Sequence, residues 1–170
     1  MREVISNMHQ LIDKMAQDVV KLLGEKKLML CTAESCTGGL LSGAITGVAG
    51  SSEIFGLGVV AYGDSFKEFM LGVSKETLEK HGATSAECAA EMAVGVRKAS
   101  DAGVGISITG IAGPGGGTPK KPVGTIYLAC SYKDKLNTLT LGINKDQDRN
   151  YIRLEAVIQA LILILNTIEE

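Results

Sequence analysis

The sequence predicts a three-layer α/β/α fold built on a five-stranded sheet. Apolar residues recur at helical spacing near both ends of the chain. Between these segments, short apolar runs typical of buried strands alternate with further helical patterns. The last two runs are separated only by Lys133–Lys135, which is short enough for a hairpin. We therefore expect a mixed, mostly parallel sheet with a late antiparallel hairpin.

The size and composition of the chain indicate one domain over residues 1–170. Apolar residues make up 45% of the chain and charged residues 21%, which is ordinary for a globular protein. The formal net charge is -2 and there is no basic run, so we expect no nucleic-acid partner. The apolar run Ala160–Leu165 is too short to cross a bilayer, so we expect no membrane association.

Cysteine and histidine usage limits the possible chemistry. The four cysteines form no C-x-x-C pair, which argues against a zinc or thioredoxin-type site and favours a reducing, cytoplasmic environment. The two histidines, His9 and His81, are too scattered for a metal site or a Ser-His-Asp triad. We expect neither a metal nor a cofactor, and a different group must handle protons if the chain is a hydrolase.

The elements of the first half follow from periodicity and stop signals. The first helix should run from residue 3 to Leu23 and stop at Gly24. Its apolar stripe should face the core or a second subunit. After it we expect the strand Lys27–Thr32, a helix ending near Gly47, the strand Leu57–Tyr62, and a short helix, Ser65–Leu71, capped by Asp64.

The second half continues the alternation. The helices Ser74–His81 and Ala86–Ala99 come first, and Ser85 should cap the second of them. The remaining elements are the strands Val104–Thr109, Val123–Tyr132 and Asn137–Ile143, and a final helix from Asp148 to about Ile168.

The stretch Ala33–Gly39 joins the first strand to the next helix and gathers small polar side chains. Such a turn lies at the carboxyl edge of a sheet, where α/β proteins place ligands. The first turn of the following helix also offers unpaired backbone N–H groups. A helix cap made by Ser, Thr and Gly explains the stretch equally well when it is taken alone.

A glycine-rich loop, Gly110–Pro122, follows the third predicted strand. Its glycines let backbone N–H groups approach an anion closely, and Thr109, Thr118 and the neighbouring lysines add ligand-type groups. The loop matches neither a Walker P-loop nor a dinucleotide-binding turn, because it leads into a strand. A loop of this length in a compact domain is usually functional or disordered.

Tyr62 and Lys67 are the candidates for proton transfer. Tyr62 should end a strand at the same sheet edge as Ser35, and Lys67 lies about one turn inside the next helix. Burial there would disfavour the charge of Lys67 and let it accept the serine proton, as in Ser-Lys enzymes. Asp64 would oppose this by holding the lysine charged, and a solvated Lys67 with Tyr62 at the rim is the simpler interpretation.

Cys36 competes with Ser35 as the nucleophile, because a nearby helix N-terminus lowers the pKa of a thiol. The two side chains are adjacent in the chain and point apart, so at most one of them faces a substrate. Thr37 and the amides of Gly38 and Gly39 would form an oxyanion hole. Glu34 would orient a partner or bind a ligand hydroxyl.

Three stretches together resemble the CinA carboxy-terminal domain family, whose stand-alone members include nicotinamide-nucleotide amidases. They are Ala33–Gly39, Val59–Tyr62 with Lys67, and Ser107–Gly117 with Lys121–Thr125. The resemblance spans residues 10–165. Arg149 and Arg153 match a family pattern at the start of the last helix, although Gln147 replaces its usual glycine.

The resemblance implies metal-independent hydrolysis of nicotinamide mononucleotide to nicotinate mononucleotide and ammonia. It implies Ser35 as the nucleophile and Tyr62 and Lys67 as its proton-handling partners. The residues expected to contact the substrate lie in the two loops and at the start of the last helix: Glu34, Cys36, Thr37, Gly38, Gly39, Thr109, Gly110, Gly113, Gly115, Gly116 and Arg149. The partner is thus a small-molecule nucleotide, with Arg149 a suitable phosphate contact.

Two alternatives remain at this point. One is a catalytically silent nucleotide-binding module, and the other is an amidase that acts on another nucleotide amide. We also expect a homodimer, because the apolar stripes of the first and last helices suit a subunit interface as well as a core.

Overall fold

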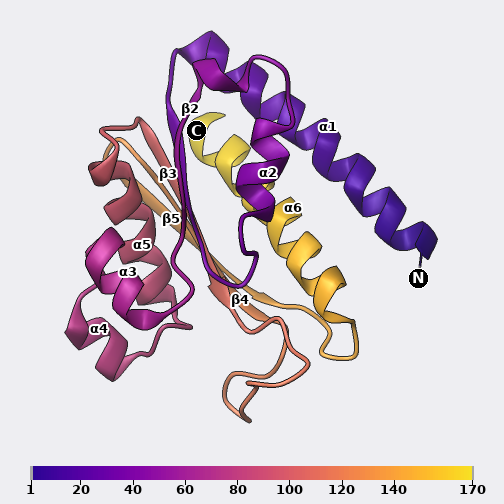
Figure 1. Ribbon diagram of the computed structural model, residues 1–170, viewed down its shortest axis with the longest axis vertical. Helices are drawn as coiled ribbons and strands as arrows, with labels where there is room; N and C mark the ends of the chain where they lie inside the picture. Colours follow the sequence, from indigo (N-terminus) through magenta and orange to yellow (C-terminus); the bar gives the residue numbers. More distant parts are fainter. Residues whose placement is uncertain (1, 170) are drawn as a thin grey trace.

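A five-stranded sheet lies between two layers of helices in the computed structural model, which describes residues 2–169 (Figure 1). The strand order is β2-β1-β3-β4-β5. β1 is parallel to β2 and β3, while β4 is antiparallel to β3 and β5. The strands are β1 (Leu30–Glu34), β2 (Phe55–Val60), β3 (Val104–Gly110), β4 (Thr125–Tyr132) and β5 (Lys135–Gly142). The predicted mixed, mostly parallel sheet with a late hairpin is confirmed.

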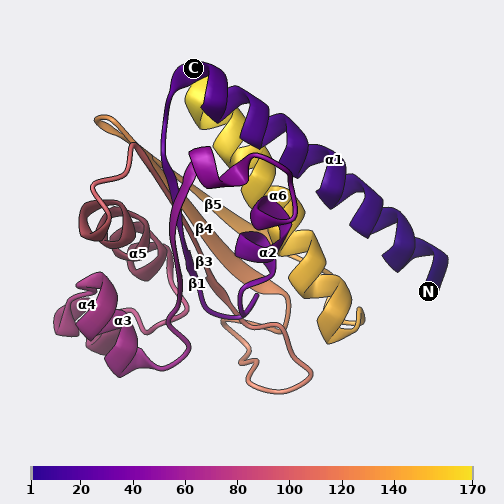
Figure 2. The ribbon, with the colours of Figure 1, turned by 45° about the horizontal axis from the view of Figure 1, so that its top comes forward.

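The helices divide between the two faces of the sheet. α1, α2 and α6 cover one face and α3, α4 and α5 cover the other (Figures 1 and 2). Their bounds are α1 (Arg2–Lys26), α2 (Leu40–Thr46), α3 (Asp64–Leu71), α4 (Lys75–Lys80), α5 (Ala86–Ala99) and α6 (Arg149–Glu169), with a short 3₁₀ turn, η1, at Ser51–Glu53. The predicted three-layer arrangement is therefore also confirmed.

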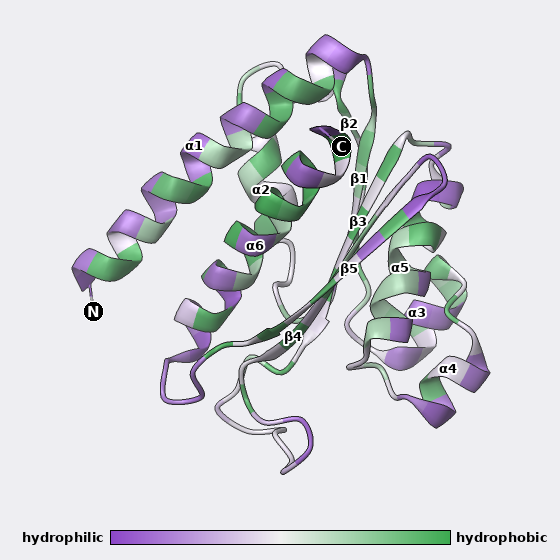
Figure 3. Cartoon of the chain, turned by 180° about the vertical axis from the view of Figure 1, so that it is seen from behind, coloured by the Kyte–Doolittle hydropathy of each residue, from purple (hydrophilic) through white to green (hydrophobic). Residues whose placement is uncertain are grey.

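α6 is the central helix of its layer. By length and composition alone it could cross a membrane. It instead packs against α1 and the sheet, and hydrophobic residues run along much of its length (Figure 3). Its buried side chains are Ile152, Leu154, Ala156, Val157, Ile158, Ala160, Leu161, Ile164, Thr167 and Ile168. The apolar stripe of α1 packs against α6. The apolar stripes of both helices are therefore buried, at least in part, within one chain.

The end of α1 differs from the prediction. Gly24 does not stop the helix, which continues to Lys26. Lys27 then takes a left-handed conformation at φ 53°, and the N–H of Leu28 bonds to the carbonyl of Leu23 at 3.0 Å. This is the hydrogen-bond pattern of a Schellman motif, in which Lys27 occupies the position usually held by glycine.

The starts of the later helices were predicted with mixed success. Ser85 and Asp148 cap α5 and α6, and each accepts a hydrogen bond from the N–H three residues later, at 3.1 and 2.8 Å. Asp64 is wrong as a cap, because Gly63 holds that position and Asp64 is already helical. β2 ends at Val60, so Tyr62 lies beyond the strand that it was expected to end.

The connections that matter for function gather at one end of the sheet. The turn after β1, the β2–α3 connection, the loop between β3 and β4 and the start of α6 all lie there (Figure 2). In a sheet whose first three strands are parallel, this is the carboxyl edge of β1, β2 and β3.

Gly95 and Gly43 are both helical, but they differ in how closely a neighbouring helix packs against them. A Cβ on Gly95 of α5 would lie 1.7 Å from the carbonyl oxygen of Leu71, whereas one on Gly43 of α2 would meet nothing within 4 Å. We expect Gly95→Ala to lower the free energy of unfolding by about 3 kcal/mol or more, since the backbone of α3 must shift. Gly43→Ala should raise it by about 0.5–1 kcal/mol.

Urea denaturation of both variants measures the difference. Because the chemical change is the same in each, the contrast isolates the α3–α5 contact. Equal stability of the two variants would contradict the packing described above.

Candidate active site

Ser35 follows β1 and begins the turn that leads to α2. Its N–H donates to the carbonyl of Ile108 on β3 at 2.9 Å, so the serine backbone is still fixed to the sheet. Its side chain is buried, at 8% exposure, and its hydroxyl has no hydrogen-bond partner within residues 2–169. The N–H of Gly38 closes the turn on the carbonyl of Ser35 at 3.0 Å. Ser35 is therefore held rigidly, with its hydroxyl unengaged.

Glu34 has a different role from the one predicted. Its buried carboxylate accepts four hydrogen bonds: from the N–H groups of Gly39 and Leu41, and from both the N–H and the hydroxyl of Ser42, at 2.6–3.1 Å. A carboxylate has about four lone-pair sites, so none remains for a ligand. Glu34 caps the N-terminus of α2, and the expectation that it binds a ligand hydroxyl is wrong.

The same hydrogen bonds correct the predicted oxyanion hole. The N–H of Gly39 donates to the carboxylate of Glu34, and the N–H of Gly38 donates to the carbonyl of Ser35. The N–H of Thr37, in contrast, has no partner within the described residues. Among the fully buried side-chain nitrogen and oxygen atoms of residues 2–169, only the Thr37 hydroxyl lacks a hydrogen bond. Such atoms are rare, and each costs about 1–3 kcal/mol.

Lys67 is buried on the inner side of α3, at 1% exposure, and is not the solvated helix lysine of the simpler interpretation. Its Nζ donates to the carbonyls of Ala61 and Tyr62 at 3.0 and 3.2 Å. A lysine amine can make three hydrogen bonds, so these two leave one position for a further partner. Asp64 lies 3.9 Å away with 65% of its side chain exposed, where water weakens an ion pair.

The register of the sheet brings Lys67 and Ser35 to the same sheet edge. Glu34 pairs with Val60 across the parallel β1–β2 contact, and the N–H of Ala61 bonds to the carbonyl of Glu34 at 2.9 Å. The residue after each partner is therefore Ser35 on one side and Ala61 on the other. The Lys67 amine binds the Ala61 carbonyl, so it lies at the same edge of the sheet as the serine.

Tyr62 and Arg149 meet at the mouth of this edge. The hydroxyl of Tyr62 accepts a hydrogen bond from Nη2 of Arg149 at 2.9 Å, while Nη1 donates to the carbonyl of Gly113. The Tyr62 backbone carbonyl, and not its hydroxyl, contacts Lys67. The expectation that the Tyr62 hydroxyl assists Lys67 is therefore not met in this arrangement, and the tyrosine side chain belongs with Arg149.

The glycine loop is anchored where it meets the α4–α5 junction. The hydroxyl of Thr109 donates to the carbonyl of Ala83 at 2.8 Å. Nζ of Lys121 donates to the carbonyls of His81 and Thr84. Both side chains thus hold the loop, and the substrate contact of Thr109 stays a prediction.

The glycines of the loop fall into two groups. Gly110 and Gly113 pack closely: a Cβ would lie 2.6 Å from the carbonyl of Thr125 in the first case and 2.6 Å from Val123 in the second. Gly115 and Gly116 are exposed, and nothing lies within 4 Å of a Cβ on Gly115. Among the loop glycines predicted to contact a substrate, Gly115 and Gly116 are the two whose backbone is accessible to a ligand.

Cys36 is a buried member of the core and not a reactive thiol. Burial raises its pKa to about 11, and this effect exceeds the lowering by its own backbone N–H and by Arg149 and Arg153. The expectation that the helix N-terminus produces a thiolate is wrong, because desolvation dominates. Ser35 is thus the nucleophile that the geometry favours.

Arg153 is the remaining charged side chain of the site, and no separate role was predicted for it. From α6 it donates through Nε to the carbonyl of Cys36 at 3.1 Å and through Nη2 to the carbonyl of Thr37 at 2.7 Å. Its spacing of four residues from Arg149 places both arginines on one face of the helix, which was the signal available in the sequence.

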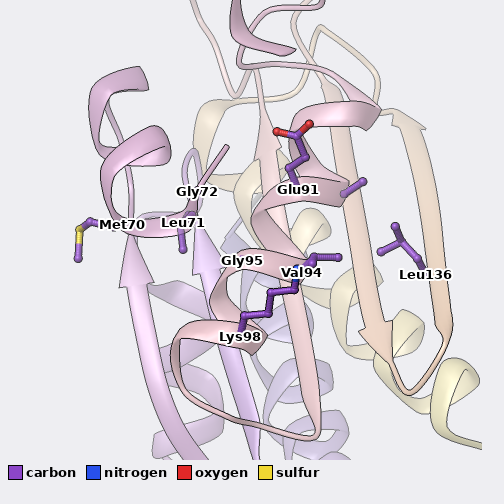
Figure 4. Close-up of a pocket in the computed structure, with 9 residues that line it drawn as sticks. Met70, Leu71, Gly72, Glu91, Val94, Gly95, Lys98 and Leu136 are labelled. Atoms are coloured by element: carbon purple, nitrogen blue, oxygen red, sulfur yellow. The ribbon is translucent and has the colours of Figure 1, made fainter. Parts of the chain in front are cut away.

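A separate apolar cavity of about 530 Å³ lies between α3, α5 and β5 (Figure 4). Met70, Val94 and Leu136 contribute to its walls. Of its charged residues, Glu91 accepts hydrogen bonds from Ser74 and Thr77. We place the candidate site at the sheet edge instead, because polar groups converge there. No cluster of three His, Cys, Asp or Glu side chains suited to a metal occurs in residues 2–169.

Comparison with known proteins identifies the family. Residues 12–168 match the model of the CinA C-terminal domain. The chain belongs to this family. It is 47% identical to a CinA-like protein of Thermotoga maritima and 48% identical to one of Kosmotoga olearia, each over 149 residues. Each match covers 88% of the chain but only 36% of the relative, so the chain spans about a third of the length of these relatives.

Solved structures of the CinA superfamily have the same size and fold. The competence/damage inducible protein CihA from Agrobacterium tumefaciens superposes with a TM-score of 0.90 at 39% identity, covering 94% of this chain and 96% of that one. A CinA superfamily protein from Escherichia coli gives a TM-score of 0.87 at 35% identity, covering 92% and 90%. The resemblance seen in the sequence is therefore confirmed at the level of the family, and none of these names states a reaction.

The burial of the cysteines predicts how the folded protein reacts with alkylating agents. Burial raises the pKa of Cys36 and Cys88 to about 11 and that of Cys130 to about 12, and it also raises the pKa of Cys31. A thiol below its pKa is protonated and unreactive. We expect iodoacetamide at pH 7–8 to leave the folded chain unmodified in intact-mass measurements.

The control is the same treatment in denaturant, which should modify all four free cysteines. Selective alkylation of Cys36 in the folded protein at pH 7 would contradict this account and restore the cysteine as a candidate nucleophile.

Proposed function

We propose that the chain is a metal-independent serine amidase. Its proposed reaction is the hydrolysis of the carboxamide of nicotinamide mononucleotide to nicotinate mononucleotide and ammonia. The observation that carries the proposal is that the buried Lys67 amine binds the Ala61 carbonyl at the sheet edge where the hydroxyl of Ser35 is unengaged. A serine beside a desolvated lysine is the arrangement of Ser-Lys hydrolases, and it needs no histidine.

In the proposed mechanism, Ser35 Oγ attacks the carboxamide carbon while its proton passes to Nζ of Lys67. The negative charge that develops on the carbonyl oxygen is stabilised by the free N–H of Thr37. The C–N bond then breaks, and ammonia leaves with the proton returned by Lys67. Water hydrolyses the resulting ester on Ser35, with Lys67 again acting as the base.

A nucleotide substrate is supported by the positive groups around this edge. Arg149 uses two of its five N–H donors on the Tyr62 hydroxyl and the Gly113 carbonyl, which leaves others for a phosphate. The open backbone at Gly115 and Gly116 offers further N–H groups for the same anion. We assign the ribose phosphate to this part of the site.

One observation favours a catalytically silent nucleotide-binding module. Asp64 lies 3.9 Å from Nζ of Lys67, and a lysine that forms an ion pair with it is an ammonium, which cannot accept a proton. Calorimetric binding of nicotinamide mononucleotide without ammonia release would support this second function. A panel of nucleoside and nucleotide amides separates it from an amidase with another substrate. The homodimer and the cytoplasmic location expected from the sequence stay predictions.

The test is ammonia release from nicotinamide mononucleotide by substituted proteins. We expect Ser35→Ala and Lys67→Met each to lower kcat by at least about 10³-fold, because each removes a group that makes or breaks a bond to the reacting proton. Ser100→Ala and Lys75→Met are the matched controls, since both side chains lie outside the site, and they should keep full activity.

Near wild-type turnover by Ser35→Ala would rule out the serine mechanism. Loss of activity in Cys36→Ala together with retention in Ser35→Ala would move the nucleophile to the cysteine.

A further inference from the structure

Arg153 is the side chain that fixes the middle of the turn after Ser35. Glu34 holds the far end of that turn through the amide of Gly39, and the Ser35 carbonyl binds the amide of Gly38. Neither contact touches the peptide group between Cys36 and Thr37. Within residues 2–169, the carbonyl of that group is bound by Nε of Arg153 at 3.1 Å. The orientation of this peptide therefore depends on Arg153.

The direction of the Thr37 N–H follows from peptide geometry. In a trans peptide the C=O and the following N–H point in opposite directions. Because the Cys36 carbonyl points to Arg153 on α6, the Thr37 N–H points away from α6. It meets no acceptor within the described residues, although it follows the nucleophile by only two positions.

Arg153 also strengthens this N–H as a donor. A guanidinium that binds a carbonyl draws electron density from the peptide group and makes its N–H a better hydrogen-bond donor. The second bond, from Nη2 to the Thr37 carbonyl at 2.7 Å, stops the guanidinium from rotating. Lysine is a point charge without this fork, so it could not hold both carbonyls in the same way.

The turn is shaped to admit the guanidinium. Gly38 has φ 60°, in the left-handed region, and a Cβ on it would lie 3.4 Å from Nη2 of Arg153. The absence of a side chain at Gly38 therefore serves both the turn and the approach of the arginine.

We propose that Arg153 is a positioning residue for the oxyanion site. It acts through the Cys36–Thr37 peptide and fixes the Thr37 N–H as the donor to the oxyanion that forms when Ser35 attacks. The inference rests on the proposed serine chemistry, but it does not depend on which amide is the substrate.

The rate at which Ser35 reacts with an alkyl phosphonofluoridate tests this directly. In that reaction the serine oxygen forms a bond to phosphorus, the P–F bond breaks, fluoride leaves and Lys67 takes the serine proton. The phosphonyl oxygen then occupies the oxyanion position. We expect the wild-type chain to be labelled on Ser35 and Arg153→Ala to react about 10–100-fold more slowly, since losing one oxyanion donor costs about 10²–10³-fold.

Three further measurements separate positioning from folding. Arg153→Lys should lie between wild type and Arg153→Ala, and it serves as the test variant if the alanine variant does not fold. Added guanidinium ion at millimolar concentration should raise the labelling rate of Arg153→Ala but not that of wild type. Arg97→Ala is the matched control, because Arg97 also binds a backbone carbonyl, that of Lys133, but does so at the opposite edge of the sheet. It should be labelled at the wild-type rate.

A folded Arg153→Ala protein that is labelled as fast as wild type would overturn the inference, and so would a folded wild-type chain that is not labelled on Ser35. Slow labelling that guanidinium does not restore would assign Arg153 a purely structural role and would also overturn it. If labelling behaves as expected but nicotinamide mononucleotide is not hydrolysed, the proposed substrate fails and the role of Arg153 stands.

Discussion

The buried carboxylate of Glu34 is the constraint on which the site depends. A carboxylate at 0% exposure is stable only if its oxygens are fully hydrogen-bonded, and four donors at the start of α2 meet that need. Three of these donors are N–H groups that a helix leaves unpaired at its N-terminus, so strand, turn and helix are joined. Ser35 lies in the turn that these bonds close. The same bonds occupy the Gly39 amide and shift the available donor back to Thr37.

The cations of the site bind backbone carbonyls, and this decides its electrostatic character. Lys67, Lys121, Arg149 and Arg153 all donate to main-chain oxygens. A carbonyl satisfies a donor without cancelling its charge. The four side chains therefore keep their positive charge at this edge, where positive charge attracts anionic ligands.

Much of the fold could be predicted because periodicity and stop signals are local. The hairpin follows from a short connection, and the caps Ser85 and Asp148 follow from side-chain chemistry at single positions. The strand order could not be predicted in this way, because β1 pairs with β3, which is distant in the sequence. The end of α1 could not be predicted, because Lys27 adopts a left-handed conformation for which glycine is the usual signal. Asp64 was misplaced by one position for a similar reason, since Gly63 takes the cap without a side-chain bond.

The sequence was sufficient to name most residues of the candidate site, but not to predict what each of them does. Ser35 and Lys67 could be named from the sequence because parallel strands bring their ends to one edge. The role of Glu34 could not, because the sequence does not show that four donors converge on it. The pKa of Cys36 depends on burial, which outweighs the helix terminus that the sequence suggests. Arg153 was recognised as part of a family pattern, but its role could not be predicted because its partners are backbone carbonyls.

The central claim is that Ser35 forms a covalent acyl intermediate at this edge. Rapid acid quenching of the wild-type chain during turnover of nicotinamide mononucleotide, followed by peptide mass spectrometry, measures this most directly. The account predicts an ester on Ser35 whose mass equals that of the substrate minus ammonia. An adduct located on Cys36, or full release of ammonia with no adduct on Ser35 at any quench time, would contradict it.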